Sequence, residues 1–303
     1  MRVKGRARNV DPLRRMLGFR GTPPPQAAAH RGIAALNKRV IDQMQRRAAE
    51  RARIDRERRK MLAPLMQLMR QDKRAMQAAQ NRRRLTVRTA KPKISYPRVL
   101  QRIETHVRTG SILTLIAPPY DLAWGDNSSS DQTTWGTWVA EKAPPDPRIN
   151  STTNIGNGGS AWSSAGVGMW FIPAAISAWV RIGIYGPYDY NWRDDSTWAT
   201  AHTDGFIAVY VQSFDLNGGD PRDEVDRRIR LWSDGSADLE DHADSGSGYY
   251  PSDTYFMATN ARQYAVWAWC NTSADGSSGS LIYSYAFGTL SVPVPFMVFE
   301  QWT

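Results

Sequence analysis

The chain has 303 residues and a formal net charge of +10, and this charge is divided unevenly along the sequence. Residues 1–110 hold 30 of the 39 Lys and Arg residues but 7 of the 29 Asp and Glu residues, a net +23, whereas the rest carries a net −13 and all 12 Trp. The basic part has too few aromatic residues to build a core, which excludes a uniformly folded chain. We expect a basic arm joined to an acidic globular domain.

The cysteine content and the hydropathy pattern exclude several further classes. The single cysteine, Cys270, rules out an internal disulfide framework and any zinc site built from several cysteines. The N-terminal segment lacks the apolar stretch of roughly 7 to 15 residues that a secretory signal needs. The longest apolar run, residues 167–180, contains Pro173 and is shorter than the roughly 20 residues of a membrane span. We expect synthesis in the cytoplasm without a signal peptide, and no membrane partner.

The arm divides into three segments by composition. Residues 1–30 contain scattered Arg, several Gly and a run of three Pro, which predicts an extended basic leader. Residues 31–80 are rich in good helix formers, which predicts one helix of roughly 30 residues up to Pro64 and a second from Leu65 to Gln80. Residues 81–110 contain Pro92 and Pro97 and read as a basic, extended linker. The globular domain is expected to span residues 111–303.

The predicted helices carry an apolar stripe. When heptads are counted with Ile33 as position a, the a positions are mostly apolar and the d positions are mostly polar. A regular two-stranded coiled coil, which needs both to be apolar, therefore fits poorly. A helix packed along another surface, or a loose trimeric stalk, fits better. We expect a contact between subunits, with a trimer favoured, through Ile33, Val40, Ile54, Met61, Leu65, Leu68, Met69 and Met76.

Arginine dominates the basic arm. Of its 30 basic residues 24 are Arg, whose planar guanidinium pairs with phosphate or carboxylate in a bidentate manner. Three interpretations stay open: a solvated helix surface, contact with phosphate, and contact with the acidic domain of a neighbouring copy. The candidate residues for binding a polyanion or a partner are Arg58, Arg59, Arg82, Arg83 and Arg84.

Beyond residue 110 the pattern changes to short apolar alternations separated by polar turns. Residues 112–116, 178–185 and 206–214 alternate as strands do, and Asn217-Gly218 predicts a hairpin turn that leads into a return strand at residues 226–232. A second hairpin is predicted between residues 264–270 and 281–290. The fold class predicted is mainly β: an antiparallel, jelly-roll-like β-sandwich preceded by a basic, partly α-helical N-terminal arm.

No catalytic constellation emerges from the sequence, and we expect neither an enzyme nor a bound cofactor. The four His residues are scattered, and the HExxH, CxxC, GxSxG and P-loop motifs are absent. The carboxylates Asp215, Asp220 and Asp223 are of the type that holds Ca²⁺, but they lack the EF-hand spacing. His242 stands among Asp and Glu residues and is a candidate for a carboxylate–His pair. A solvated acidic loop is the favoured interpretation of both segments, so no metal site is expected.

One aromatic segment is a candidate ligand site. Residues 185–198 combine five aromatic residues with Asp, Asn and Arg in a stretch that reads as a loop. Sugars bind to flat aromatic faces, and loops at the end of a rigid sandwich are suitable places for such a site. The alternative is that these rings cover the end of the sandwich or fill a subunit interface. The candidate glycan-binding residues are Tyr188, Tyr190, Trp192 and Trp198.

The order of a basic, partly helical arm and a β-sandwich resembles virus coat proteins with Arg-rich arms ahead of a jelly roll, and phage fibre or decoration proteins. The resemblance covers the layout of the whole chain. It implies a structural component of a symmetric particle, located in a virion or phage-like particle and in contact with itself and other particle proteins. The alternatives are a glycan-binding module with a basic attachment leader, and a coat protein that packages nucleic acid through its arm.

Overall fold

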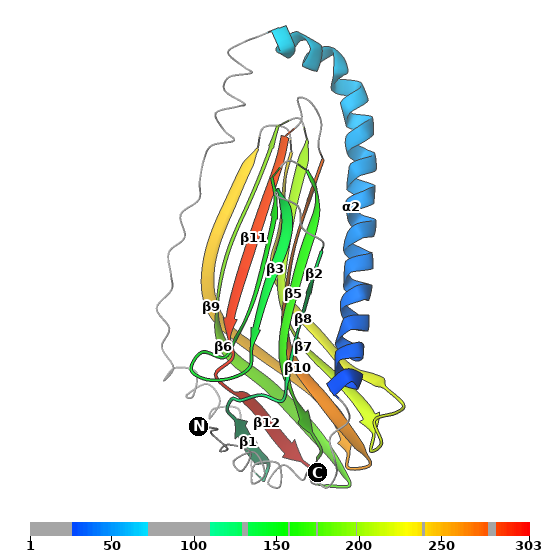
Figure 1. Ribbon diagram of the computed structural model, residues 1–303, viewed down its shortest axis with the longest axis vertical. Coiled ribbons are helices and arrows are strands. Elements are labelled where there is room, and N and C mark those ends of the chain that lie inside the picture. Colours follow the sequence, from blue (N-terminus) through cyan, green and yellow to red (C-terminus); the bar gives the residue numbers. More distant parts are fainter. Residues whose placement is uncertain are drawn as a thin grey trace, which may run out of the picture.

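The structure is a computed structural model that describes residues 26–71, 110–128, 133–156, 158–173, 175–197, 199–237, 240–277 and 283–303. The predicted leader up to residue 25 and nearly all of the predicted linker lie outside the described residues. The described part contains one long helix, α2, and two antiparallel β-sheets that face each other (Figure 1).

The larger sheet has seven strands in the order β1-β12-β6-β11-β4-β3, with β9 paired to the other side of β6. Its strands are β1 (Ile112–Ile116), β3 (Thr134–Glu141), β4 (Arg148–Ile155), β6 (Ser177–Thr197), β9 (Asp241–Thr259), β11 (Tyr283–Pro293) and β12 (Met297–Trp302). The smaller sheet has five strands in the order β2-β5-β10-β7-β8. These are β2 (Leu122–Asn127), β5 (Gly159–Phe171), β7 (Thr200–Asp215), β8 (Arg222–Ala237) and β10 (Arg262–Gly276).

The strand pairing is nested, as it is in a long hairpin that has been rolled up. β7 pairs with β8, β6 with β9, β5 with β10 and β4 with β11, in each case antiparallel. Folding this hairpin over itself places β4-β11-β6-β9 in one sheet and β5-β10-β7-β8 in the other. This is the arrangement of a jelly roll. The predicted jelly-roll-like β-sandwich is therefore confirmed.

Two local predictions differ from the structure. The predicted hairpin between residues 264–270 and 281–290 does not form, because β10 pairs with β5 and β7 while β11 pairs with β4 and β6 in the opposite sheet. Residues 185–197, expected to be a loop, belong to the 21-residue strand β6. The turn predicted at Asn217-Gly218 is present between β7 and β8, with Gly218 at a φ of 86°.

The core lies between the two sheets and is built from alternate residues of each long strand. On β6 the inward residues are Val180, Ile182 and Ile184, which pack among inward side chains of β5, β7 and β10. The opposite face of the smaller sheet is also apolar, with Trp267 and Trp269 fully buried on β10. A strand that is apolar on both faces needs a cover on each side.

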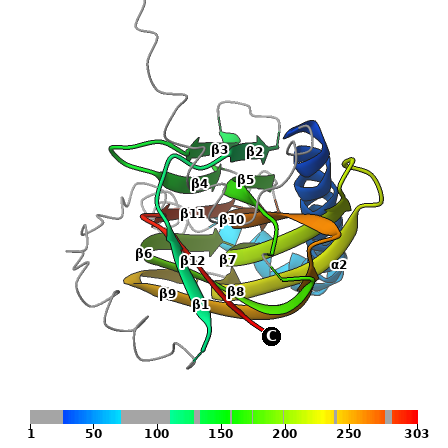
Figure 2. The ribbon, with the colours of Figure 1, turned by 90° about the horizontal axis from the view of Figure 1, so that it is seen from below.

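Helix α2 (Gln26–Gln71) supplies the second cover. It lies along the outer face of the five-stranded sheet, so the molecule has three layers, and its later part extends past the ends of the strands (Figures 1 and 2). It begins earlier than the predicted residue 31 and continues through Pro64, where the sequence predicts a break. No described helix combines the length and the apolarity needed to cross a membrane.

Candidate functional site

The contact between α2 and the five-stranded sheet begins with an apolar stripe. Helix residues spaced three to four apart are buried there, as expected for one face of an α-helix: Ala29, Ile33, Leu36 and Val40. They pack against the outward aromatic residues of the sheet, which are Trp170, Phe206, Tyr210, Phe214, Trp267 and Trp269. The stripe therefore docks α2 on the same chain.

Polar contacts hold the helix at positions farther along. The Arg39 guanidinium lies 2.6 Å from an Asp223 carboxylate oxygen, and Arg51 binds Asp275 through two hydrogen bonds of 3.0 and 2.5 Å. The buried Asp55 carboxylate accepts hydrogen bonds from the hydroxyls of Thr200 and Ser277, both 2.5 Å. Acidic residues of the globular domain thus pair with basic residues of the arm within one chain.

A short buried chain of hydrogen bonds lies beneath the helix. Ser164 Oγ donates to Asn37 Oδ1 at 2.7 Å and accepts from Asn271 Nδ2 at 2.8 Å. All three side chains are buried, and a buried polar group costs free energy unless it is paired. Only a helix in this register offers the Asn37 carbonyl to Ser164, so the contact helps to fix the position of α2.

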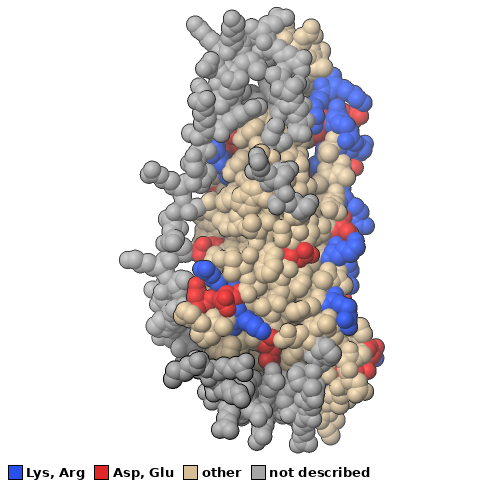
Figure 3. All heavy atoms as spheres, in the orientation of Figure 1, with Lys and Arg blue, Asp and Glu red and all other residues tan. Residues whose placement is uncertain are grey.

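The solvent side of α2 is strongly basic. The helix carries 12 Lys and Arg residues against four Asp and Glu residues, and Figure 3 shows basic side chains gathered along the edge that α2 occupies. Three pairs within the helix, namely Lys38–Asp42, Glu50–Arg53 and Glu57–Lys60, neutralise part of this charge. Four exposed arginines form no ion pair with any residue in the described part of the chain: Arg31, Arg46, Arg47 and Arg56.

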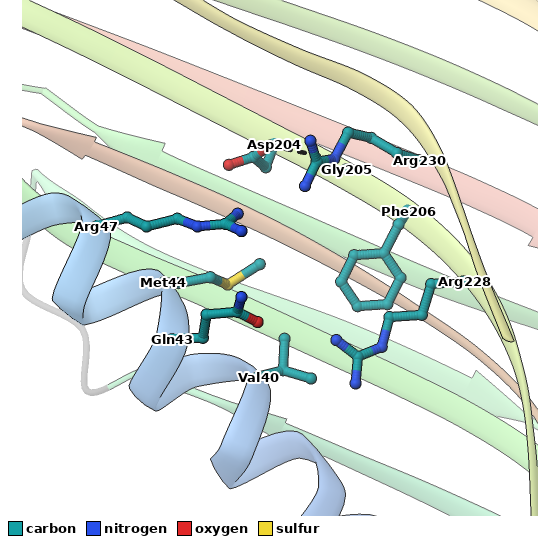
Figure 4. A pocket seen from close by; sticks show the side chains of 9 residues that line it. All are labelled: Val40, Gln43, Met44, Arg47, Asp204, Gly205, Phe206, Arg228 and Arg230. Carbon is teal, nitrogen blue, oxygen red and sulfur yellow. Dashed lines mark ion pairs between the residues drawn. The ribbon is translucent and has the colours of Figure 1, made fainter. Parts of the chain in front are cut away.

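A pocket of about 300 Å³ opens where α2 crosses β7 and β8. Arg47 reaches into it from the helix, and Arg228 and Arg230 reach into it from β8, while Val40, Gln43, Met44, Gly205 and Phe206 form much of the remaining wall (Figure 4). Asp204 is the acidic residue of the lining. Three guanidinium groups around an apolar floor suit a ligand that carries phosphate or carboxylate.

The three arginines are not equally available. Arg228 lies 5.7 Å from the centre of the Phe206 ring and pairs with Asp226 through bonds of 3.0 and 2.5 Å. Arg230 lies 3.9 Å from the Asp204 carboxylate. Arg47 has no partner among the residues that the structure describes, so it is the cation of the pocket that remains free for an incoming anion.

Asp204 remains charged beside these arginines. Burial alone would raise the pKa of Asp204, but a 2.8 Å hydrogen bond with His202 and the charge of Arg230 lower it below its usual value. The lining therefore keeps one negative charge against three positive charges at neutral pH. This pocket could not be recognised in the sequence, because its arginines come from two segments that are about 180 residues apart.

In the structure, some residues of the predicted docking face are buried and others are exposed. Ile33 and Val40 are buried against their own sheet, which corrects the expectation of a contact between subunits at these positions. Ile54, Met61 and Leu68 lie beyond this contact and are exposed. Leu65 and Met69 lie on α2 with side chains outside the described set, and Met76 lies outside the described residues.

The predicted polyanion-binding residues are placed in part. Arg58 and Arg59 lie on α2 and are half-buried, and the Arg59 Nε atom is buried without a hydrogen-bond acceptor among the described residues. Arg82, Arg83 and Arg84 lie outside the described residues. Arg46, Arg47 and Arg56 are further exposed cations of α2, and they enlarge the basic surface predicted from the sequence.

The three carboxylates named as a Ca²⁺ candidate do not converge. Asp215 accepts hydrogen bonds from the backbone N–H groups of the turn that follows it, at 2.9 and 2.7 Å. Asp220 pairs with Arg222 and Arg262, whose guanidinium groups lower its pKa, and Asp223 pairs with Arg39. Each carboxylate is already engaged, so the structure gives no Ca²⁺ site there.

The predicted glycan residues form an internal stack. Tyr188 and Tyr190 stack at a centroid distance of 6.4 Å, and Tyr190 stacks at 5.3 Å on Trp232 of the opposite sheet. Trp192 is buried in the core at 6% exposure, and Trp198 lies outside the described residues. The expectation that these rings form a sugar platform on a loop is therefore wrong for Trp192, whose ring has no free face.

Comparisons with known proteins identify no family. No protein-family model and no curated protein sequence matches the chain. Among solved structures, similarity is found to the carbohydrate-binding module TmCBM61 in complex with β-1,4-galactotriose, at 12% identity and a TM-score of 0.18, over 65% of this chain and 92% of that one. Similarity to an infectious bursal disease virus protein (Gx strain) has 11% identity and a TM-score of 0.17, over 72% of this chain and 40% of that one. These scores are too low to carry an argument about function.

Proposed function

We propose that this protein is the structural subunit of a particle built from many copies, in which the basic arm faces acidic material and the jelly roll forms the shell. The observation that carries the proposal is the position of α2. A helix with 12 basic residues is fastened along one sheet of a jelly roll, and Arg31, Arg46 and Arg56 on it are exposed without an ion pair to the described chain. The positive charge is thereby concentrated on one side of the molecule.

Nucleic acid is the acidic material that this side of the molecule suits best. Arg46, Arg47 and Arg56 are exposed and lack carboxylate partners in the described chain, so each can pair with a phosphate. The segments on either side of α2 add further charge, since residues 1–25 carry a net +6 and residues 72–109 a net +9. In this account the arm gathers polyanion, and contacts between jelly rolls set the geometry of the shell.

Charge substitution tests the proposal better than truncation does. Removal of α2 would expose Trp267 and Trp269 to water, so an arm-deleted chain is expected to lose stability as well as charge. In the full-length protein, Arg46→Ala with Arg56→Ala removes two unpaired cations from α2. The matched control is Arg148→Ala with Arg222→Ala, which removes two exposed cations from the jelly roll.

The measurement is the affinity for a single-stranded oligonucleotide as a function of salt concentration. The α2 variant should bind more weakly, with a salt slope reduced by about 0.7 for each phosphate that it no longer neutralises, while the control retains the wild-type slope. Equal slopes in the wild type and the α2 variant would refute the assignment of the basic face.

The second candidate function is a glycan-binding module with a basic attachment leader. The pocket below α2 is the observation that favours it, because Arg47 and the Phe206 ring together suit an acidic sugar. A glycan array tests this candidate with Arg47→Ala as the variant. Loss of an acidic-glycan signal in that variant would support the module, and the absence of any signal from the wild type would remove it.

A further inference from the structure

A second polar cluster lies close to the pocket, since Asp234 on β8 pairs with Thr203, the residue before Asp204 on β7. Asp194 of β6, Asp234 of β8 and His242 of β9 place one ligand-type atom each within 4.8 Å of one another. His242 Nδ1 lies 3.2 Å from Asp234 Oδ1 and 3.9 Å from Asp194 Oδ1. β6 and β9 belong to the larger sheet and β8 to the smaller one, so the cluster joins the two sheets.

Asp194 is the unusual member of this cluster. Its side chain is fully buried, and neither carboxylate oxygen has a hydrogen-bond partner of good geometry in the described chain, although the nearby Ser236 hydroxyl lowers its pKa slightly. A buried carboxylate without well-formed hydrogen bonds costs several kcal/mol unless a cation or a proton compensates it. Burial and the neighbouring charge of Asp234 disfavour the charged form of this carboxyl and raise the pKa of Asp194 to about 7.

The atoms around the cluster suit a bound cation. The Asp234 and His242 side chains are each 38% exposed, so an ion can enter from solvent and meet the buried Asp194 behind them. The second ring nitrogen, His242 Nε2, lies on the side away from Asp194 and Asp234, 4.0 Å from Glu240 Oε2, which accepts a hydrogen bond from the Ala237 backbone N–H. The Nδ1 atom is therefore the nitrogen that faces the two aspartates.

We propose that Asp194, Asp234 and His242 form a binding site for a divalent transition-metal ion, with Zn²⁺ the ion that the ligands fit best. Carboxylate oxygens and imidazole nitrogens are both zinc ligands, and a site with three protein ligands leaves the fourth tetrahedral position to water or substrate. Ca²⁺ takes six to eight oxygen ligands and fits a three-residue site with a nitrogen donor poorly. The ligand atoms of His242 lie 3.2 Å from Asp234 and 3.9 Å from Asp194. An ion placed between them could therefore form zinc bonds of roughly 2.0 to 2.2 Å after little movement of the side chains.

The bound ion would link the two sheets near the end of β8 and the start of β9. β8 is the outer strand of the five-stranded sheet and β9 lies at the side of β6, so both strands are held by a neighbour on one side. A metal ion held by residues of β6, β8 and β9 closes this end of the jelly roll. The inference is independent of the proposed particle function.

The test uses full-length protein stripped with a chelator and dialysed, then titrated with Zn²⁺ in a calorimeter. We expect one Zn²⁺ per chain and a rise in melting temperature on binding. Asp194→Asn, which keeps the size of the side chain, and His242→Ala, at a half-exposed position, should each abolish stoichiometric binding. The matched control is Asp226→Asn, because Asp226 is a surface carboxylate of β8 that pairs with Arg228. This variant should bind Zn²⁺ as the wild type does.

Three results would overturn the proposal. Wild-type protein that takes up less than one Zn²⁺ per chain at micromolar concentrations would show that Asp194 is compensated by a proton alone. Asp194→Asn or His242→Ala with wild-type affinity would place the ion elsewhere. Displacement of Zn²⁺ by an equal concentration of Ca²⁺ would refute the assignment of the metal. If Asp194→Asn does not fold, His242→Ala decides the outcome.

Discussion

Truncation of Leu36 tests whether α2 is docked on its own jelly roll. Leu36 is 1% exposed and lies in the cluster formed by the helix and the outward aromatic residues of the five-stranded sheet. Leu36→Ala removes three carbon atoms from this contact. At about 0.8 kcal/mol per buried carbon the loss is about 2.4 kcal/mol. The remaining cavity adds to this, and the total is expected at about 3 kcal/mol, within the usual range of buried Leu→Ala substitutions.

The assay is denaturant unfolding of the full-length protein, followed by tryptophan fluorescence. Trp267 and Trp269 lie directly under the helix, so their emission reports its release. Met61→Ala is the matched control, because Met61 lies on the same helix and is 76% exposed. Its effect should stay within about 0.5 kcal/mol. Equal effects of the two substitutions would refute the docking of α2, and a red-shifted emission in Leu36→Ala before global unfolding would support it.

Three further predictions concern contacts that the structure resolves. The ion pair between Arg51 and Asp275 is half-buried and bidentate, so a double-mutant cycle with alanine should give a coupling energy of about 1.5 to 3 kcal/mol, and a value near zero would contradict the contact. Burial raises the pKa of Asp223, but hydrogen bonds from Tyr210 and Arg39 outweigh it and lower the pKa overall. The wild type should therefore exceed Asp223→Asn in unfolding free energy above pH 4, and this difference should shrink as the pH falls through the lowered pKa; a difference that stays constant from pH 7 to pH 2 would contradict the assignment. A methyl group at Gly205 would overlap the Trp232 ring, so Gly205→Ala should lower the unfolding free energy by about 1 to 3 kcal/mol, and an unchanged denaturant midpoint would argue against this packing.

The fold class follows from the sequence because short apolar or alternating segments are separated by polar turns, without helical periodicity between them. Val180, Ile182 and Ile184 alternate with residues of the other face, and this pattern marks β6 without knowledge of its neighbours. The later half of β6 could not be assigned in this way. Tyr188 and Tyr190 lie across from Gly248 and Gly246 of β9, and their rings cover these glycines. That cross-strand partnership involves residues about 60 positions away, so local composition indicated a loop.

The arm was predictable as a basic helical segment, but its partner was not. Ile33 and Val40 show the spacing of a docking face, and this spacing is the same whether the partner is another subunit or the same chain. The partner is the same chain because Trp267 and Trp269 lie on the outward face of β10, where α2 buries them from water. The pocket and the Asp194 cluster were equally hidden, since each combines residues from several strands or from α2 and a strand.

The mass of the full-length protein in solution decides whether the protein assembles into a particle of many copies. Light scattering should be read on the same chromatographic peak as the ratio of absorbance at 260 and 280 nm, at low and at high salt. The account predicts a discrete assembly of many copies, with excess absorbance at 260 nm that salt removes as phosphate contacts are screened. A monomer at every salt concentration, with the absorbance ratio of protein alone, would contradict it.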